Sequence, residues 1–244
     1  MNNILLVMKF WDDGQPKSTR IRNVEYTWVK LKELSKYLNE NGVMCESKLY
    51  DFSPDKIMEE SIHVSYILGE YKKSEKTNLI LKQNSDFNYV FMFDCDAFFL
   101  KNDYDKLLNI LKTLETKCII TFDLAKLDEN ASINVINRDD IDMANDEFSY
   151  AYSGDKKNGP LGLGHMGGLG GVYLCDISLI VESGGFDESY MCWGGEDGDM
   201  MSRIMYSNKP HKRIPISNFA PFHLSHFMDW GNTKYYKGPN NDKN

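Results

Sequence analysis

Hydrophobic positions in the first half of the chain follow two different periods. "ILLVMKF" near the N-terminus and "YVFMF" from Tyr89 are continuous apolar runs of strand length, as expected for strands covered on both faces. Between them, apolar residues recur every three or four positions from Val24 to Leu38, and Gly42 follows. This spacing predicts a helix that ends at the glycine. The alternation of strand and helix predicts a parallel sheet with helices on both faces.

The same reading assigns the remaining regular segments. "MCESKLYDF" and "KCIITFDL" are predicted strands, and "VYLCDISLIVESGG" is predicted to be a strand followed by a helix. Asp103 is expected to begin a helix over "DYDKLLNILKTLE". Ser53 as N-cap, with Pro54 at the first helical position, predicts one or two helices before Gln83.

The second half of the chain is less periodic. From Ala125 to Gly164 the sequence is polar, and it then becomes rich in glycine, which is typical of long functional loops. No internal repeat or linker separates a second unit, so we predict an α/β fold with one domain over residues 1–236. Its sheet is expected to be mostly parallel and Rossmann-like, and residues 237–244 are expected to form a mobile tail.

Composition and charge exclude several classes of protein. The 244 residues carry a net charge of −8 with no basic stripe, which argues against nucleic acid as a partner. No run approaches the ~18 apolar residues of a membrane span, and the N-terminal sequence does not resemble a signal peptide. The five cysteines are odd in number and form no CxxC pair, so we expect reduced thiols, a cytoplasmic location and no structural zinc.

Two carboxylates end the apolar run "YVFMFDCD". Because side chains alternate along a strand, Asp94 and Asp96 are expected to point the same way, beyond the carboxyl end of the strand where ligands bind in open parallel sheets. Carboxylate oxygens suit Mg²⁺ or Mn²⁺, and such ions usually bridge to phosphates. Asp-x-Asp also occurs at 103/105, 140/142 and 197/199, so the buried strand before it is what favours a functional pair at 94/96.

Two further segments carry candidate chemistry. Glu196, Asp197 and Asp199 follow a glycine pair and stand in the first turn of a predicted helix, where acids also simply stabilise the helix dipole. His223 and His226 are three residues apart, so on a helix or turn they could share a face and add nitrogen ligands to a carboxylate site. An incidental pair of loop histidines is the alternative.

The three segments in this order resemble the GT-A fold glycosyltransferases. "GGVYL", "GGFDE" and "WGGED" are similar to the galactosyltransferase C-terminal region shared by β-1,4-galactosyltransferases, chondroitin-type polymerases and, more distantly, polypeptide N-acetylgalactosaminyltransferases. The resemblance covers Tyr89–Leu100 and Gly167–His226 and is only architectural over the first 85 residues. It implies a nucleotide-binding half over residues 1–124 and an acceptor-binding, catalytic half over residues 125–236.

The resemblance also implies roles for the metal site. Asp96 resembles a ligand of Mn²⁺ or Mg²⁺, and Asp94 resembles the residue near the nucleotide ribose and metal-bound water. In the family a Met-x-x-His stretch supplies two further ligands. Here His226 matches the histidine and His223 stands where the methionine would be, a departure that should make Mg²⁺ more acceptable beside Mn²⁺.

The remaining implied roles concern transfer itself. Asp197 maps onto the catalytic base, and its acid, in place of the amide of retaining relatives, favours inversion. Glu196 and Trp193, with Gly194 and Gly195, are implied to lie beside the acceptor. The implied reaction moves a hexose or N-acetylhexosamine from a nucleotide sugar, usually UDP-linked, to a glycan hydroxyl.

One basic residue is a candidate for the donor, and two other functions stay open. Arg20 or Arg22, after the first loop, could reach the diphosphate, although a basic residue at such a position is more commonly just solvated. A haloacid-dehalogenase-like phosphatase also ends a strand with Asp-x-Asp, but its motif lies early in the chain and Phe98 stands where Thr or Val is expected. An inactive carbohydrate-binding module is the non-enzymatic alternative.

Overall fold

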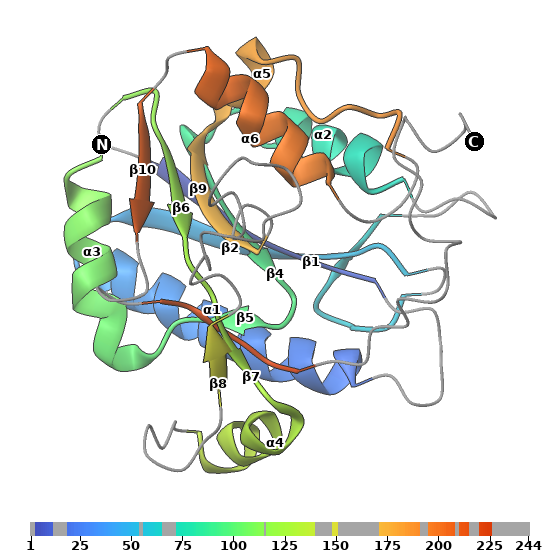
Figure 1. Cartoon of the computed structure of the whole chain (residues 1–244), viewed down its shortest axis with the longest axis vertical. Helices are drawn as coiled ribbons and strands as arrows, with labels where there is room; N and C mark the ends of the chain where they lie inside the picture. The colour runs from blue at the N-terminus through green and yellow to red at the C-terminus, as the bar shows by residue number, and fades with distance from the viewer. Residues whose placement is uncertain are drawn as a thin grey trace.

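A computed structural model describes most of the chain (Figure 1). The described residues are 3–11, 19–53, 56–64, 72–114, 116–139, 148–150, 171–190, 195–207, 210–214 and 220–225. The strands are β1 (Asn3–Phe10), β2 (Met44–Asp51), β3 (Ile62–His63), β4 (Tyr89–Asp94), β5 (Ala97–Phe98), β6 (Ile119–Phe122), β7 (Ala125–Leu127), β8 (Phe148–Tyr150), β9 (Val172–Asp176), β10 (His211–Ile214) and β11 (Phe222–His223). The helices are α1 (Arg20–Glu40), α2 (Lys73–Gln83), α3 (Tyr104–Lys112), α4 (Glu129–Arg138), α5 (Ile177–Glu182) and α6 (Glu196–Tyr206), with a 3₁₀ turn at Lys101–Asp103.

Seven strands form the main sheet in the order β10-β6-β9-β4-β1-β2-β3. Neighbouring strands are parallel except around β9, which runs antiparallel to both β4 and β6. The predicted α/β class and the mostly parallel sheet are therefore confirmed, with one reversed strand, β9, between β6 and β4. Figure 1 shows α1 and α3 on one side of this sheet and α2, α5 and α6 on the other.

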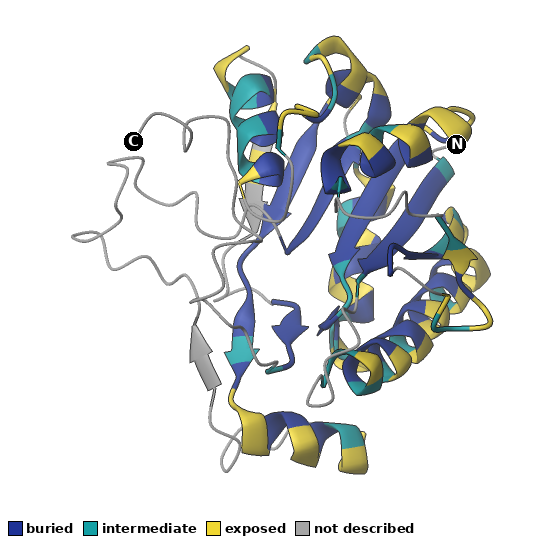
Figure 2. Cartoon of the chain, turned by 90° about the vertical axis from the view of Figure 1, so that its right-hand side faces the viewer, coloured by how far each residue is buried: buried dark blue, intermediate teal, exposed yellow. Residues whose placement is uncertain are grey.

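The central strand β1 divides its side chains between the two helical layers. Ile4, Leu6 and Met8 belong to the core shared with α1 and α3, whereas Leu5 and Val7 belong to the core shared with α2, α5 and α6. This is the period of two expected of a strand buried on both faces. Figure 2 shows buried strands between helices whose outer surfaces are exposed.

A second, smaller sheet has the order β5-β11-β7-β8 and lies with α4 at one end of the molecule. Its core includes Phe98, Leu127 and Phe222. The expectation of an irregular segment from Ala125 onward was wrong for its first part, because β7 and α4 occupy it. Asp128 caps α4 by accepting a hydrogen bond from Ala131 N at 2.7 Å, a signal that the polar composition concealed.

Two other local predictions need correction. The segment from Ser53 to Gln83 does contain a helix, α2, but the expected start at Ser53 is wrong, since the described residues 56–64 form turns and β3 and α2 begins only at Lys73. The Asp51 carboxylate accepts hydrogen bonds from Ser53 N and Ile57 N, which gives this segment a turn in place of a helix. His223 lies on a strand and not on a helix or turn. Among the described helices, none combines the length and the apolar composition needed to cross a lipid bilayer.

Candidate active site and metal centre

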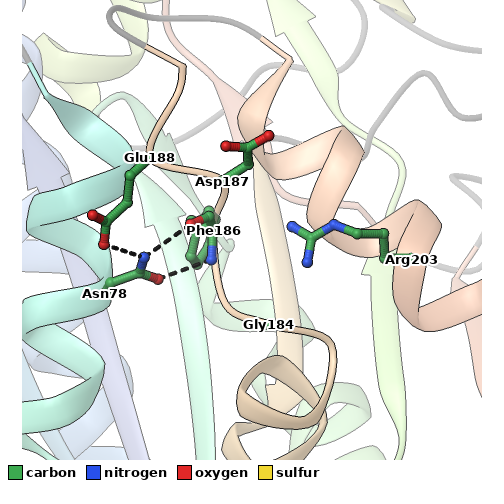
Figure 3. Close-up of a pocket in the computed structure, with 6 residues that line it drawn as sticks. All are labelled: Asn78, Gly184, Phe186, Asp187, Glu188 and Arg203. Atoms are coloured by element: carbon green, nitrogen blue, oxygen red, sulfur yellow. Dashed lines mark hydrogen bonds between the residues drawn. The ribbon is translucent and has the colours of Figure 1, made fainter. Parts of the chain in front are cut away.

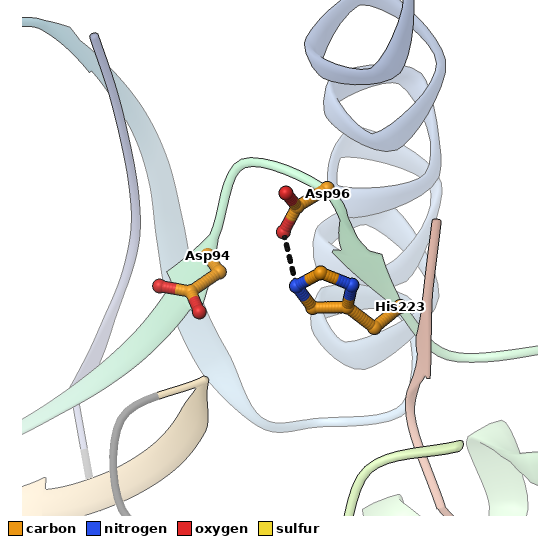
Figure 4. Close-up of side chains that lie close together, drawn as sticks. All are labelled: Asp94, Asp96 and His223. Atoms are coloured by element: carbon orange, nitrogen blue, oxygen red, sulfur yellow. Dashed lines mark ion pairs between the residues drawn. The ribbon is translucent and has the colours of Figure 1, made fainter. Parts of the chain in front are cut away.

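Two carboxylates and an imidazole meet at the carboxyl end of β4. Asp94, Asp96 and His223 each offer a ligand atom, and these atoms lie within 4.8 Å of one another (Figure 4). His223 Nε2 is 3.0 Å from Asp96 Oδ1. Asp96 and His223 are buried, and Asp94 is partly buried. The structure thus brings together three residues that are up to 129 positions apart in the sequence, counting from 94 to 223.

A turn after β4, rather than a longer strand, places Asp96. The strand ends at Asp94, and Cys95 and Asp96 form the turn that leads into β5, so the alternation argument does not hold for Asp96. Thr27 donates its hydroxyl to Cys95 O at 2.6 Å and fixes this turn against α1. The turn, and not the alternation of side chains along a strand, brings Asp96 into the cluster.

The second sheet supplies the histidine. β11 pairs antiparallel with β5, with His223 opposite Ala97, and Leu224 N donates to Asp96 O at 2.8 Å. On the other side of the cluster, Asp94 N donates to Gly171 O at 2.8 Å. Main-chain hydrogen bonds from two directions therefore hold the segments that carry the ligands.

The electrostatics of the cluster suit a divalent cation. Burial raises the pKa of Asp94 to about 7, and the nearby Asp96 carboxylate adds to this effect. Burial alone lowers the pKa of His223, but the Asp96 carboxylate outweighs it and the net pKa is raised. Two carboxylates and one imidazole form an oxygen and nitrogen donor set that fits Mn²⁺ or Mg²⁺, whose charge would offset the mutual repulsion of the acids.

A second group of ionisable side chains is buried at the N-terminus of α6. Glu196 and Asp197 are 1% and 5% exposed, and both pair with the ammonium of Lys73, which is 3.0 Å from Asp197 Oδ2. The Tyr173 hydroxyl donates to Asp197 Oδ1 at 2.9 Å. The Asp197 carboxylate therefore has a partner on each oxygen.

The lysines around Asp197 determine its charge state. Burial alone would raise the pKa of Asp197, but the Lys73 and Lys9 ammonium groups and the hydrogen bond from Lys73 lower it to about 2. Lys9 is itself buried, because it extends the side of β1 that faces α2 and α6, and burial lowers its own pKa. Lys9 on β1 is paired in register with Asp94 on β4, so it links the group around Asp197 to the cluster of Asp94, Asp96 and His223.

The other predicted site residues fall in different places. Gly195 has φ +88°, the left-handed conformation that favours glycine, and it stands immediately before α6. Arg22 lies in the first turn of α1, where its guanidinium donates to Asn23 Oδ1. Trp193, Gly194 and His226 lie outside the described residues.

A shallow pocket of about 410 Å³ lies apart from these residues (Figure 3). It is lined by Asn78, Gly184, Phe186, Asp187, Glu188 and Arg203, none of which is a predicted site residue. Asn78 bonds to the Phe186 main chain at N and O and to Glu188, while Arg203 reaches Gly185 O. These bonds fix the turn at residues 184–188, which leads toward α6 and its acids.

Sequence reasoning missed two lysines of the site. Lys9 carried a usable signal, because a lysine inside the apolar run "ILLVMKF" must be buried with a partner. Lys73 carried none, since it stands in the charged stretch "YKKSEK", which is typical of a solvated helix start. The sequence alone allows Tyr173 either to stack on a sugar or a base or to pack in the core; in the structure it is 0% exposed, in the core, and bonds to Asp197.

Comparisons with known proteins agree with this architecture. Residues 163–227 match a family model described as the N-terminal domain of galactosyltransferase. The catalytic domain of Drosophila β1,4-galactosyltransferase 7 in complex with xylobiose is similar over 100% of this chain and 78% of its own, with a TM-score of 0.55 and 14% identity. No curated protein has a significant sequence match.

Two further solved structures are similar in fold. A mutant of the same Drosophila enzyme with manganese, UDP-Gal and xylobiose has a TM-score of 0.54 and 14% identity, over 99% of this chain and 78% of its own. GalNAc-T7 with UDP, GalNAc and Mn²⁺ has a TM-score of 0.50 and 13% identity, over 96% of this chain and 46% of its own. The chain therefore has the fold of the GT-A glycosyltransferases, and its residues 163–227 form a galactosyltransferase-type region.

Proposed function

We propose that this protein transfers a hexose or N-acetylhexosamine from a nucleotide sugar, UDP-linked, to a hydroxyl of a glycan acceptor, with inversion and with Mn²⁺ or Mg²⁺ as cofactor. The observation that carries the proposal is the cluster of Asp94, Asp96 and His223 at the carboxyl end of β4, on a GT-A fold. The similar solved structures that contain UDP-Gal or UDP also contain manganese, which supports the donor and the metal.

The residues of the cluster suit the donor side of the reaction. Asp96 and His223 would hold the ion and Asp94 would contact the ribose or a metal-bound water. When bound, the ion would neutralise the charge that builds on the departing diphosphate. Arg22 stays a candidate for the same phosphates. His226 stays a predicted ligand outside the described residues.

The acids at the start of α6 suit the acceptor side. An acceptor hydroxyl has a pKa far above 7, so it needs a base within hydrogen-bond reach as the new bond forms. Asp197 is ionised and held in place, which fits that role, and its acid supports a single displacement with inversion. Glu196, Trp193, Gly194 and Gly195 are proposed to line the acceptor, and a cytoplasmic location stays a prediction.

A panel of nucleotide sugars with Mn²⁺, scored by thermal shift and by donor turnover, tests the proposal. EDTA should abolish turnover, and Asp96→Ala or His223→Ala should lose both turnover and the stabilisation by Mn²⁺, which is about 2.7 kcal/mol at a hundredfold excess over Kd. His63→Ala, a histidine on β3 outside the cluster, is the matched control. Full turnover in EDTA would contradict the metal-dependent mechanism, and phosphatase activity without any sugar nucleotide would favour the phosphatase alternative.

A further inference from the structure

The Asp197 carboxylate is gripped from two separate elements of the fold. Lys73, the first residue of α2, reaches Oδ2 at 3.0 Å, and Tyr173 on β9 donates to Oδ1 at 2.9 Å. The Lys73 side chain is 6% exposed and also contacts Glu196. Lys73 and Tyr173 lie outside α6, so the direction of this carboxylate depends on how the sheet and α2 are packed, as well as on its α6 neighbour Glu196.

These two contacts limit rotation of the Asp197 carboxylate but leave it able to accept further hydrogen bonds. Each carboxylate oxygen can accept two hydrogen bonds, so one contact on an oxygen does not exhaust its capacity. A buried carboxylate that loses a charged partner is strongly disfavoured, so Lys73 both fixes the group and keeps it ionised. A catalytic group displaced by only about 1 Å can lose on the order of a hundredfold in rate.

We propose that Lys73 and Tyr173 are positioning residues that hold the Asp197 carboxylate, ionised and aligned, for the acceptor hydroxyl. The inference rests on the proposed function, in which Asp197 is the base. It assigns neither residue a contact with substrate. The role proposed for Lys73, the buried lysine on α2, is to position the base and is separate from metal binding.

Other groups also face Asp197 and set the size of the effect. Among the described residues, the charged and titratable groups that face Asp197 come from five elements: Lys9 on β1, Lys73 on α2, Asp94 on β4, Tyr173 on β9 and Glu196 on α6. Because Lys9 remains when Lys73 is replaced, removal of Lys73 should shift the titration of Asp197 only in part.

Lys73→Gln is the direct test, with Lys73→Arg as the conservative variant and Lys72→Gln as the matched control. Lys72 is the preceding residue and pairs with Glu75, away from the acids. With the donor found in the panel, Lys73→Gln should lower kcat by on the order of a hundredfold. Because the Lys73 charge also lowers the pKa of Asp94, donor KM and the thermal shift given by Mn²⁺ with UDP are compared well above pH 7, where they should stay unchanged. Lys73→Arg should recover part of kcat, and Lys72→Gln should behave as wild type.

A second readout needs no substrate. In the wild type, Asp197→Asn should alter the pH dependence of unfolding between about pH 4 and 2, because the folded pKa of Asp197 is about 2 and the ordinary value is 3.8. In the Lys73→Gln background that window should narrow, because its lower edge, the folded pKa, rises while its upper edge, the unfolded pKa, does not change. A lysine that only fills space would leave the window where it is.

Each outcome decides one of the two claims. If Asp197→Asn retains full transfer, the proposed base is wrong. If Asp197→Asn is inactive while folded Lys73→Gln has wild-type kcat, or loses kcat and donor binding together with no change in the pH window, the positioning role is overturned. Should Lys73→Gln fail to fold, Tyr173→Phe carries the test, because it removes one hydrogen bond and keeps the ring. It should lower kcat by about tenfold with donor binding intact, and an unchanged kcat would overturn the proposal.

Discussion

At the scale of single residues, burial and neighbouring charges shift the pKa values of two aspartates in opposite directions. Asp94 and Asp197 are both aspartates near the same sheet edge, yet the pKa of one is raised to about 7 and that of the other is lowered to about 2. Burial raises the pKa of both groups, and the charge of Lys73 lowers both. The difference is that Lys73 also hydrogen-bonds to Asp197, at 3.0 Å, whereas Asp94 lies beside a second carboxylate, Asp96.

The raised pKa of Asp94 predicts a pH-dependent stability in the absence of metal. Between about pH 4 and pH 7 the folded state binds more protons at this group than the unfolded state, so the free energy of unfolding should fall as pH rises through that window. Asp94→Asn should flatten this slope, as measured by urea denaturation in EDTA at several pH values. Because metal ligands must be deprotonated, the stabilisation by Mn²⁺ should grow over the same window. A slope that is unchanged by Asp94→Asn would contradict the assignment.

At the scale of elements, the turn between α5 and α6 depends on α2. Asn78 makes three hydrogen bonds to residues 186 and 188, and Gly185 at the turn has φ +75°. A Cβ at Gly185 would lie 2.9 Å from Asn78 Oδ1, so a side chain would press on the residue that holds the turn.

Gly185→Ala should therefore destabilise the protein by more than backbone strain alone. We expect a loss of about 2–3 kcal/mol, of which about 1–2 kcal/mol is the cost of a left-handed alanine. Gly42→Ala is the matched control, since Gly42 has φ +83° and a methyl group added there would meet nothing within 4 Å. Chemical denaturation of the two variants separates the cost of backbone strain from the cost of the contact with Asn78. Equal losses of unfolding free energy would show that the Asn78 side chain moves aside without a measurable cost.

Helices and strands could be predicted where the hydrophobic pattern has one clear period. They could not be predicted where long-range contacts determine the structure. The bounds of β1, β4 and α6 follow from apolar runs and from the acids that start a helix. The two-residue strands β5 and β11 carry no periodicity, and their pairing depends on each other. For the same reason Asp94 and Asp96 could be predicted as a pair from the sequence, but the turn that orients Asp96 could not. The contact of Lys73 with Asp197 spans 124 positions, so no local pattern contains it.

At the scale of the whole molecule, the metal cluster joins two sheets. Asp94 belongs to the seven-stranded sheet and His223 to the four-stranded one, whose core contains Phe98 and Phe222 with ring centroids 6.1 Å apart. The geometry of the cluster therefore depends on packing that lies outside it.

Phe222→Ala should weaken Mn²⁺ binding although Phe222 is not a proposed ligand. Removing a buried phenylalanine costs about 3–5 kcal/mol, and here the loss falls on the core that holds β11. Phe87→Ala is the matched control, because Phe87 is 7% exposed, against 6% for Phe222, and packs in the α2 layer of the main sheet. Isothermal titration with Mn²⁺ should give a higher Kd for Phe222→Ala than for Phe87→Ala at temperatures where both are folded. Equal Kd values would mean that the second sheet does not hold the histidine.

The pairing of β11 with β5 amounts to two residues, with His223 opposite Ala97. A slip by one position in so short a ladder would turn the imidazole to the opposite side and bring a hydrocarbon side chain, Phe222 or Leu224, against the two aspartates. Under the proposed function, the affinity for manganese would therefore also report whether this short strand has paired in the correct register. Molecules in which β11 has paired out of register should appear as a folded fraction that does not bind manganese.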